Sequence, residues 1–170
     1  MSLYEQTVPQ FARMLTNIEG WLDLAQEHAK AKNFDVNVLL QSRLAPDQFA
    51  LVKQVQSVCD QAKFIASRTA AKEPPKHPDT ESTFDELKAR IASVKSFLAG
   101  LTAKDFEGAD ARVVPLPFAP GKGMNAANYV CEMGLPNFYF HACMVYAILR
   151  HNGVDLGKRH YIGGVNLVDL

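Results

Sequence analysis

The sequence predicts an all-α fold, a four-helix bundle, from three observations. Four segments carry apolar residues at steps of three and four, which is the spacing of one helix face. The segments between them contain no set of strands that could build a sheet. The chain has 170 residues, of which 48% are hydrophobic, so it suits a single domain over residues 1–170 with its own core. Amphipathic helices without a sheet pack against one another as a bundle.

The first helix is expected over residues 7–32, where the apolar stripe consists of Val8, Phe11, Leu15, Ile18, Leu22 and Ala25. Thr7 is a suitable N-cap, and Pro9 is tolerated there because it falls in the first turn. An earlier start is the alternative, since Ser2 and Glu5 have the spacing of a capping box. A short extra helix is expected within residues 35–44, with Asp35 as its cap.

Two further helices are expected over residues 47–70 and 83–100. The first opens at Pro46 and Asp47, and the second opens at a capping box of Thr83 and Glu86. The polar, proline-rich residues 72–81 between them predict an exposed loop.

The last helix is expected over residues 125–152, with a kink or local break at Pro136. Residues 108–123 before it contain Pro115 and Pro117 and predict an irregular insertion or a short hairpin. The glycine-rich residues 157–170 are expected to be irregular.

Charge and composition exclude several classes of protein. The formal net charge is 0, whereas a protein that binds nucleic acid through its phosphates normally has a basic excess. The longest apolar run, residues 138–149, is too short to span a membrane, and the first residues predict no signal peptide. Three cysteines without CxxC spacing favour the reducing cytoplasm. The G-x-G-x-x-A match over residues 121–126 follows a proline-broken segment, so we reject a dinucleotide site.

Two polar residues interrupt the apolar stripe of the last helix, which consists of Val130, Gly134, Asn137, His141, Met144 and Ile148. Asn137 and His141 are four residues apart, so they share one face and are placed to bind a common ligand or metal. The alternative is a buried histidine that only hydrogen-bonds to its neighbours. The remaining histidines, His28, His77, His151 and His160, are expected in solvent, and Cys59, Cys131 and Cys143 as small core residues.

The sequence resembles a domain-of-unknown-function branch of the DinB/YfiT-like metalloenzyme superfamily. The resemblance rests on residues 135–154, with the phrases Leu-Pro-Asn and Ile-Leu-Arg-His-Asn-Gly, and extends to residues 2–9, 39–49 and 152–158. It implies a four-helix bundle, often dimeric, in which three histidines hold a divalent metal between helices. Some members of the superfamily transfer groups to or from low-molecular-weight thiols.

The resemblance carries only one of the three metal-binding histidines into this chain. The superfamily's HxxxH pair falls on Asn137 and His141, and the third ligand falls on the second long helix at Gln54, with Gln56 as the next choice. Two amide oxygens and one imidazole suit hydrogen bonding better than tight binding of a first-row metal. We therefore predict no metal cofactor, with His141 as the only candidate ligand.

The leading hypothesis is a degenerate metal site in which His141, Asn137 and Gln54 line a pocket for a small molecule or have a structural role. The alternative is a zinc- or nickel-dependent transferase or hydrolase, with His141 as a ligand of a metal that activates a thiol or water. A partner-binding module is a third possibility. We also expect a homodimer, from the resemblance and the net charge of 0.

Overall fold

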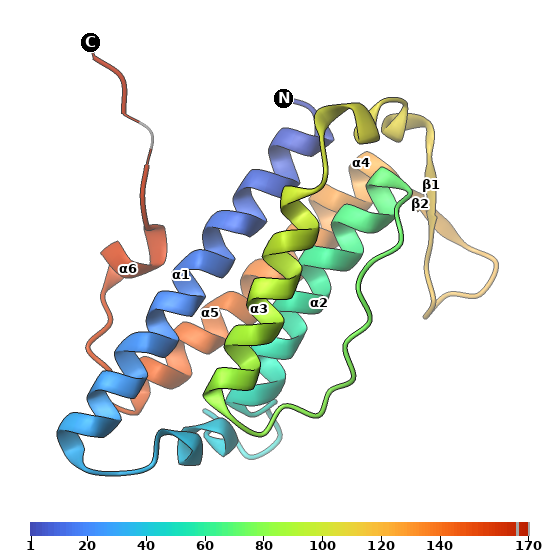
Figure 1. The fold of residues 1–170 in the computed structure, drawn as a ribbon. Helices are drawn as coiled ribbons and strands as arrows, with labels where there is room; N and C mark the ends of the chain where they lie inside the picture. Colours follow the sequence, from blue (N-terminus) through green and yellow to red (C-terminus); the bar gives the residue numbers. More distant parts are fainter. Residues whose placement is uncertain (166, 170) are drawn as a thin grey trace.

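Four long helices, α1, α2, α3 and α5, lie side by side in the computed structural model, which describes residues 1–165 and 167–169 (Figure 1). In chain order the elements are α1 (Leu3–Lys32), the 3₁₀ helix η1 (Val36–Gln41), α2 (Leu51–Ala70), α3 (Phe84–Ala99), the 3₁₀ helices η2 (Ala103–Phe106) and η3 (Ala109–Ala111), the strands β1 (Val113–Pro115) and β2 (Gly123–Asn125), α4 (Ala126–Asn128), the π-helix η4 (Tyr129–Gly134), α5 (Leu135–His151) and α6 (Lys158–Ile162). Helix α2 packs against each of the other three long helices.

The apolar stripes predicted from the sequence form one core between the long helices. Its largest fully buried side chains include Phe11, Trp21, Phe84, Tyr129 and Phe138. The rings of Phe11 on α1 and Phe138 on α5 lie 4.5 Å apart, which ties the first and last long helices together. The fold is mostly helical, consistent with the all-α class predicted. Within the described part of the chain, no helix is both long and apolar enough to cross a membrane.

Helix α1 begins at Leu3, so the expected start at residue 7 is wrong and the alternative start is correct. The Ser2 hydroxyl accepts from the backbone N–H of Glu5, and the Glu5 carboxylate accepts from the N–H of Ser2, which completes the capping box. Thr7 lies inside the helix, where its buried hydroxyl donates to the carbonyl of Leu3. The capping box of Thr83 and Glu86 at the start of α3 is confirmed.

Helix α2 begins at Leu51, four residues later than predicted. The N–H of Gln48 donates to the carbonyl of Ala45, and the N–H of Leu51 donates to the carbonyl of Ser42. These bonds hold residues 45–50 in a turn, which takes the place of a first helical turn. The short extra helix is confirmed as η1, with Asp35 accepting from the N–H of Asn37.

The last helix is interrupted before Pro136, as predicted, but the interruption is a π-helical turn, η4, between α4 and α5. Pro136 has no N–H for an α-helical bond, and its ring would clash with the carbonyl four residues earlier. The wider π-turn relieves this conflict. Gly134 at its end packs closely on α2, where an added Cβ would lie 3.1 Å from Cδ1 of Ile65.

The insertion before the last helix contains a short antiparallel hairpin, as predicted, with Val113 opposite Asn125 (Figure 1). The C-terminal segment was expected to be irregular, but residues 158–162 form α6. The indole N–H of Trp21 on α1 donates to the carbonyl of His160, and the Trp21 ring stacks on Tyr161 at 5.7 Å, which holds α6 against α1. Residues 166 and 170 of the predicted tail lie outside the described residues.

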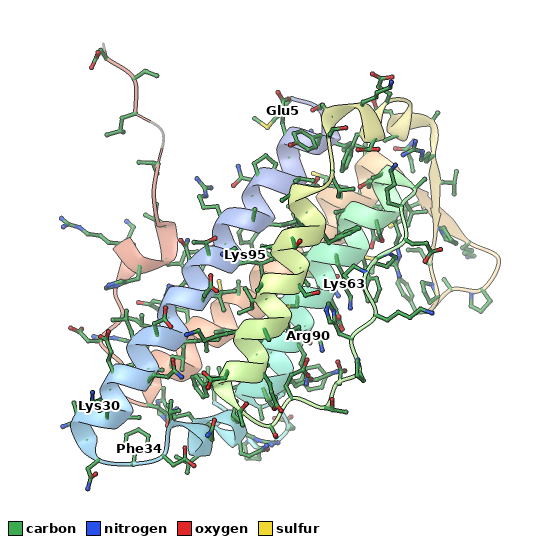
Figure 2. All side chains as sticks on the ribbon, viewed as in Figure 1. Glu5, Lys30, Phe34, Lys63, Arg90 and Lys95 are labelled. Carbon is green, nitrogen blue, oxygen red and sulfur yellow. The ribbon has the colours of Figure 1, made fainter. Side chains whose placement is uncertain are left out.

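Residues 71–83, here called the strap, run outside α2 and α3 (Figure 1). Arg90 ties the strap to these helices. The Arg90 side chain on α3 is 1% exposed. Its guanidinium binds Oδ1 of Asp60 on α2 at 2.7 Å, and Oε1 of Glu81 and Oδ1 of Asp79 on the strap at 2.9 and 3.0 Å. Figure 2 shows Arg90 and Lys63 on the strap side of these helices. The strap is largely exposed, as predicted, but it is anchored by ion pairs.

We predict that Arg90→Met lowers the free energy of unfolding by about 3–5 kcal/mol, because it leaves the carboxylate of Glu81 without a cation and removes one of the two cations that bind each of Asp60 and Asp79. Lys95→Met on the same helix is the matched control, since it removes a half-exposed pair with Glu19 and is expected to cost only about 0–1 kcal/mol. Urea unfolding followed by circular dichroism measures both. Equal costs would contradict the role given to Arg90.

Candidate functional site

His141 on α5 and Gln54 on α2 form the polar contact at the centre of the candidate site. Nδ1 of His141 lies 2.7 Å from Oε1 of Gln54, and both side chains are buried. Of the two candidates predicted on the second long helix, Gln54 is the one that contacts His141. The amide of Gln56 donates instead to Oε2 of Glu81 on the strap.

The hydrogen bonds of Gln54 determine where the imidazole of His141 carries its proton. Nε2 of Gln54 donates to the backbone carbonyl of Phe49 at 3.3 Å, so its Oε1 faces His141 as an acceptor. Nδ1 of His141 must therefore carry the hydrogen, which leaves the lone pair on Nε2. Gln54 orients the ring from behind, in the way that a carbonyl orients a metal-binding or basic histidine.

Two aromatic rings flank the imidazole of His141. Among the described residues its Nε2 has no hydrogen-bond partner, and this atom is not fully buried. The Phe49 ring lies parallel to the imidazole with centroids 6.4 Å apart, and the Phe140 ring stands at 77° to it with centroids 5.2 Å apart. Both phenyl rings are 52% exposed. The site therefore consists of one hydrogen-bond acceptor, Nε2 of His141, next to two phenyl rings.

Burial lowers the pKa of His141 below its ordinary value, and the positive charge of Lys53 lowers the pKa further. The imidazole is therefore neutral at pH 7 and available as a hydrogen-bond acceptor or a base. The hydrogen bond to Gln54 does not counteract the lowering of the pKa of His141, because a neutral amide oxygen stabilises an imidazolium less than a carboxylate would.

Asn137, the third predicted site residue, lies at the edge of the site. It is only half-buried, and within residues 1–165 and 167–169 its amide makes no hydrogen bond to His141 or Gln54. The most buried face of α5 runs one residue later than the predicted stripe, through Phe138, Ala142, Val145 and Leu149. Asn137 is consequently turned from the core toward its margin. The structure joins two of the three predicted residues.

The residues present do not fit the three-histidine metal site that the resemblance implies. His141 offers a single donor atom, Nε2, because its Nδ1 and Oε1 of Gln54 are bonded to each other. Asn137 adds one neutral amide, which is a weak ligand for zinc or nickel. In the described part of the chain, no three His, Cys, Asp or Glu side chains are grouped so that they could hold a metal ion.

The expectation for the cysteines is only partly correct. Cys59 is buried as expected, and burial raises the pKa of its thiol to about 12, which makes it a poor nucleophile. Cys131 and Cys143 are exposed rather than part of the core, because they lie on the outer face of the last helix.

A second polar cluster was missed by the sequence reasoning, which placed His77 in solvent. His77 on the strap lies 3.0 Å from both Nζ of Lys63 on α2 and Oγ of Ser93 on α3. Lys63 is almost fully buried and also pairs with Asp60. Neither Lys63 nor Arg90 interrupts an apolar stripe, so the sequence contains no local signal that they are buried.

The similarity to known proteins shows that the chain is a DinB-like helical protein. It is similar to a crystal structure of a DinB family member protein from Shewanella denitrificans at 42% sequence identity and a TM-score of 0.95, over 99% of this chain and 96% of that one. The family described as a domain of unknown function, DUF1993, matches residues 3–162, and the chain belongs to this family. The search of curated proteins found no match.

We predict that Gln54→Leu lowers the free energy of unfolding by about 1–3 kcal/mol, because it leaves the Nδ1–H of His141 and the carbonyl of Phe49 without a hydrogen-bond partner. Gln61→Leu on the same helix is the matched control, since Gln61 is half-buried and makes no side-chain hydrogen bond to a described residue. His141→Ala is expected to cost a similar amount, about 1–3 kcal/mol.

Urea unfolding of the two single variants and the double variant forms a thermodynamic cycle. The double variant should lower the free energy of unfolding by less than the sum of the losses in Gln54→Leu and His141→Ala, because the two side chains are hydrogen-bonded to each other. Strict additivity would mean that the hydrogen bond contributes nothing to stability.

Proposed function

We propose that this protein is a DinB-like four-helix bundle whose metal site has degenerated into a hydrogen-bonding site for a small molecule. The observation that carries the proposal is the bond between Nδ1 of His141 and Oε1 of Gln54. This bond occupies the amide oxygen of Gln54, to which the resemblance assigns the third ligand position, and leaves Nε2 as the free acceptor of the imidazole. Such a site can accept a hydrogen bond from a ligand without any metal.

The surroundings of His141 indicate what kind of molecule would bind. A neutral imidazole with its lone pair on Nε2 accepts from a hydroxyl or an N–H group, and a bare carboxylate or phosphate offers it no hydrogen. The half-exposed rings of Phe49 and Phe140 favour an apolar or aromatic body next to that group. The ligand class is therefore a neutral, partly aromatic molecule with one donor. The amide of Asn137 is available at the margin as a second polar contact.

The proposal extends to assembly and location. The net charge of 0 offers little electrostatic resistance to self-association, which together with the resemblance supports a homodimer. Three free cysteines without a disulfide support a reducing compartment such as the cytoplasm.

Phenol and anisole are suitable probes for this site, because they share a ring and differ in the hydroxyl hydrogen. We predict that phenol at millimolar concentration shifts the imidazole NMR signals of His141 in a saturable way, whereas anisole shifts them much less. His141→Ala should abolish saturable binding of phenol, and Gln61→Leu should leave it unchanged. Equal responses to the two probes would contradict a hydrogen bond to Nε2.

Metal binding separates this proposal from a metal-dependent transferase or hydrolase. We predict that chelator-stripped protein shows no stoichiometric, sub-micromolar binding of zinc or nickel in a calorimetric titration, because one imidazole and one amide are too weak a ligand set. The combination of Gln54→His with Asn137→His should create such binding, and adding His141→Ala should remove it again.

The opposite result for the natural protein would replace our proposal. Tight stoichiometric binding that is lost in His141→Ala would identify a working metal site and favour the transferase or hydrolase.

A further inference from the structure

His77 is the contact that holds the first half of the strap against the helices. Among the described residues, the segment 73–78 makes hydrogen bonds to α2 and α3 only through His77. The second half has several anchors, because Asp79 and Glu81 both bind Arg90. The two halves of the strap therefore differ in how firmly they are attached.

The partners of His77 require a neutral ring with its hydrogen on Nε2. Lys63 carries an ammonium group that can only donate, so Nδ1 of His77 accepts from it at 3.0 Å. Nε2 then carries the hydrogen and donates to Oγ of Ser93 at 3.0 Å. This arrangement also excludes His77 as a base that activates Ser93, since the lone pair faces Lys63 instead.

Burial and the two nearest cations oppose the protonation of His77. The charged groups around it are Asp60 and Lys63 from α2, Arg90 from α3, and Glu73, Lys76, Asp79 and Glu81 from the strap. Of the carboxylates, Asp60, Asp79 and Glu81 already bind Arg90. Burial and the positive charges of Lys63 and Arg90 lower the pKa of His77 below its ordinary value of 6.5.

An open pocket lies between α2 and the same part of the strap. Its volume is about 640 Å³, and it is lined on one side by Asp60, Lys63 and Phe64 of α2 and on the other by residues 73–79. Prolines 74, 75 and 78 make this segment stiff, so it is expected to move as one piece when its contact is lost.

We propose that His77 is an acid-sensitive latch: protonation expels its ring from Lys63 and Ser93, frees residues 73–78, and widens the pocket beside Phe64. The protonated ring has no acceptor for Lys63 and adds a third cation beside Lys63 and Arg90. The latch is closed above pH 6.5, where the ring is neutral in both states, and it weakens as the pH falls below 6.5. Residues 79–83 stay in place, because the pKa values of Asp79 and Glu81 are lowered and both carboxylates remain paired with Arg90.

NMR spectra of the full-length protein at pH 7.5 and pH 5.0 test this latch. The nuclear Overhauser contacts from the His77 ring protons to Lys63 and Ser93 should be present at pH 7.5 and should lose about two thirds of their intensity or more at pH 5.0. The contacts between α2 and α5 should stay unchanged at both pH values, which shows that the protein stays folded.

His77→Gln is the matched variant, because a glutamine amide can accept from Lys63 and donate to Ser93 but does not titrate. Its strap should show no acid response. A second measurement, the ¹⁵N shifts of the wild-type imidazole at pH 7.5, should show the hydrogen on Nε2 of His77. An equal acid response in His77→Gln, no response in the wild type, or a hydrogen on Nδ1 would each overturn the proposal.

Discussion

The burial of α2 is the constraint on which the rest of the structure depends. This helix packs against α1, α3 and α5 at once, and 13 of its 20 residues are buried, including Gln54, Gln56, Lys63, Ser67 and Thr69. Buried polar groups must find partners inside the protein. Ser67 and Thr69 find them in the carbonyls of their own helix. The longer side chains of α2 reach outward, to His141 on one side and to the strap on the other.

The helices could be predicted from the sequence because their signals are local. Apolar residues at steps of three and four predicted all four long helices. The capping boxes at Ser2 and Thr83 indicated where two of these helices begin. The errors occur where distant residues decide the local structure. Residues 47–50 resemble a helix start, but hydrogen bonds to Ser42 and Ala45 hold them in a turn. Residues 158–162 form a helix that packs against Trp21, which is more than a hundred residues away in the sequence.

The candidate site was predictable to the extent that it interrupts a pattern. His141 could be found because it breaks an apolar stripe, and the resemblance supplied Gln54. Asn137 was misplaced because a stripe read from spacing leaves the helix phase uncertain by one residue, which is a rotation of about 100°. His77, Lys63 and Arg90 break no stripe, and their partners come from a loop. Only the three-dimensional structure brings them together.

The π-turn η4 has a consequence for the alignment of the last helix. A π-turn contains one residue more than an α-turn, so it acts as an insertion inside a helix. Removing one residue between Tyr129 and Gly134 would let the helix continue regularly, but it would rotate α5 by about 100° relative to α4. His141 would then face away from Gln54, or Gly134 would lose its close contact with Ile65. The direction in which the imidazole points is therefore set seven or more residues earlier in the chain, by the π-turn of residues 129–134.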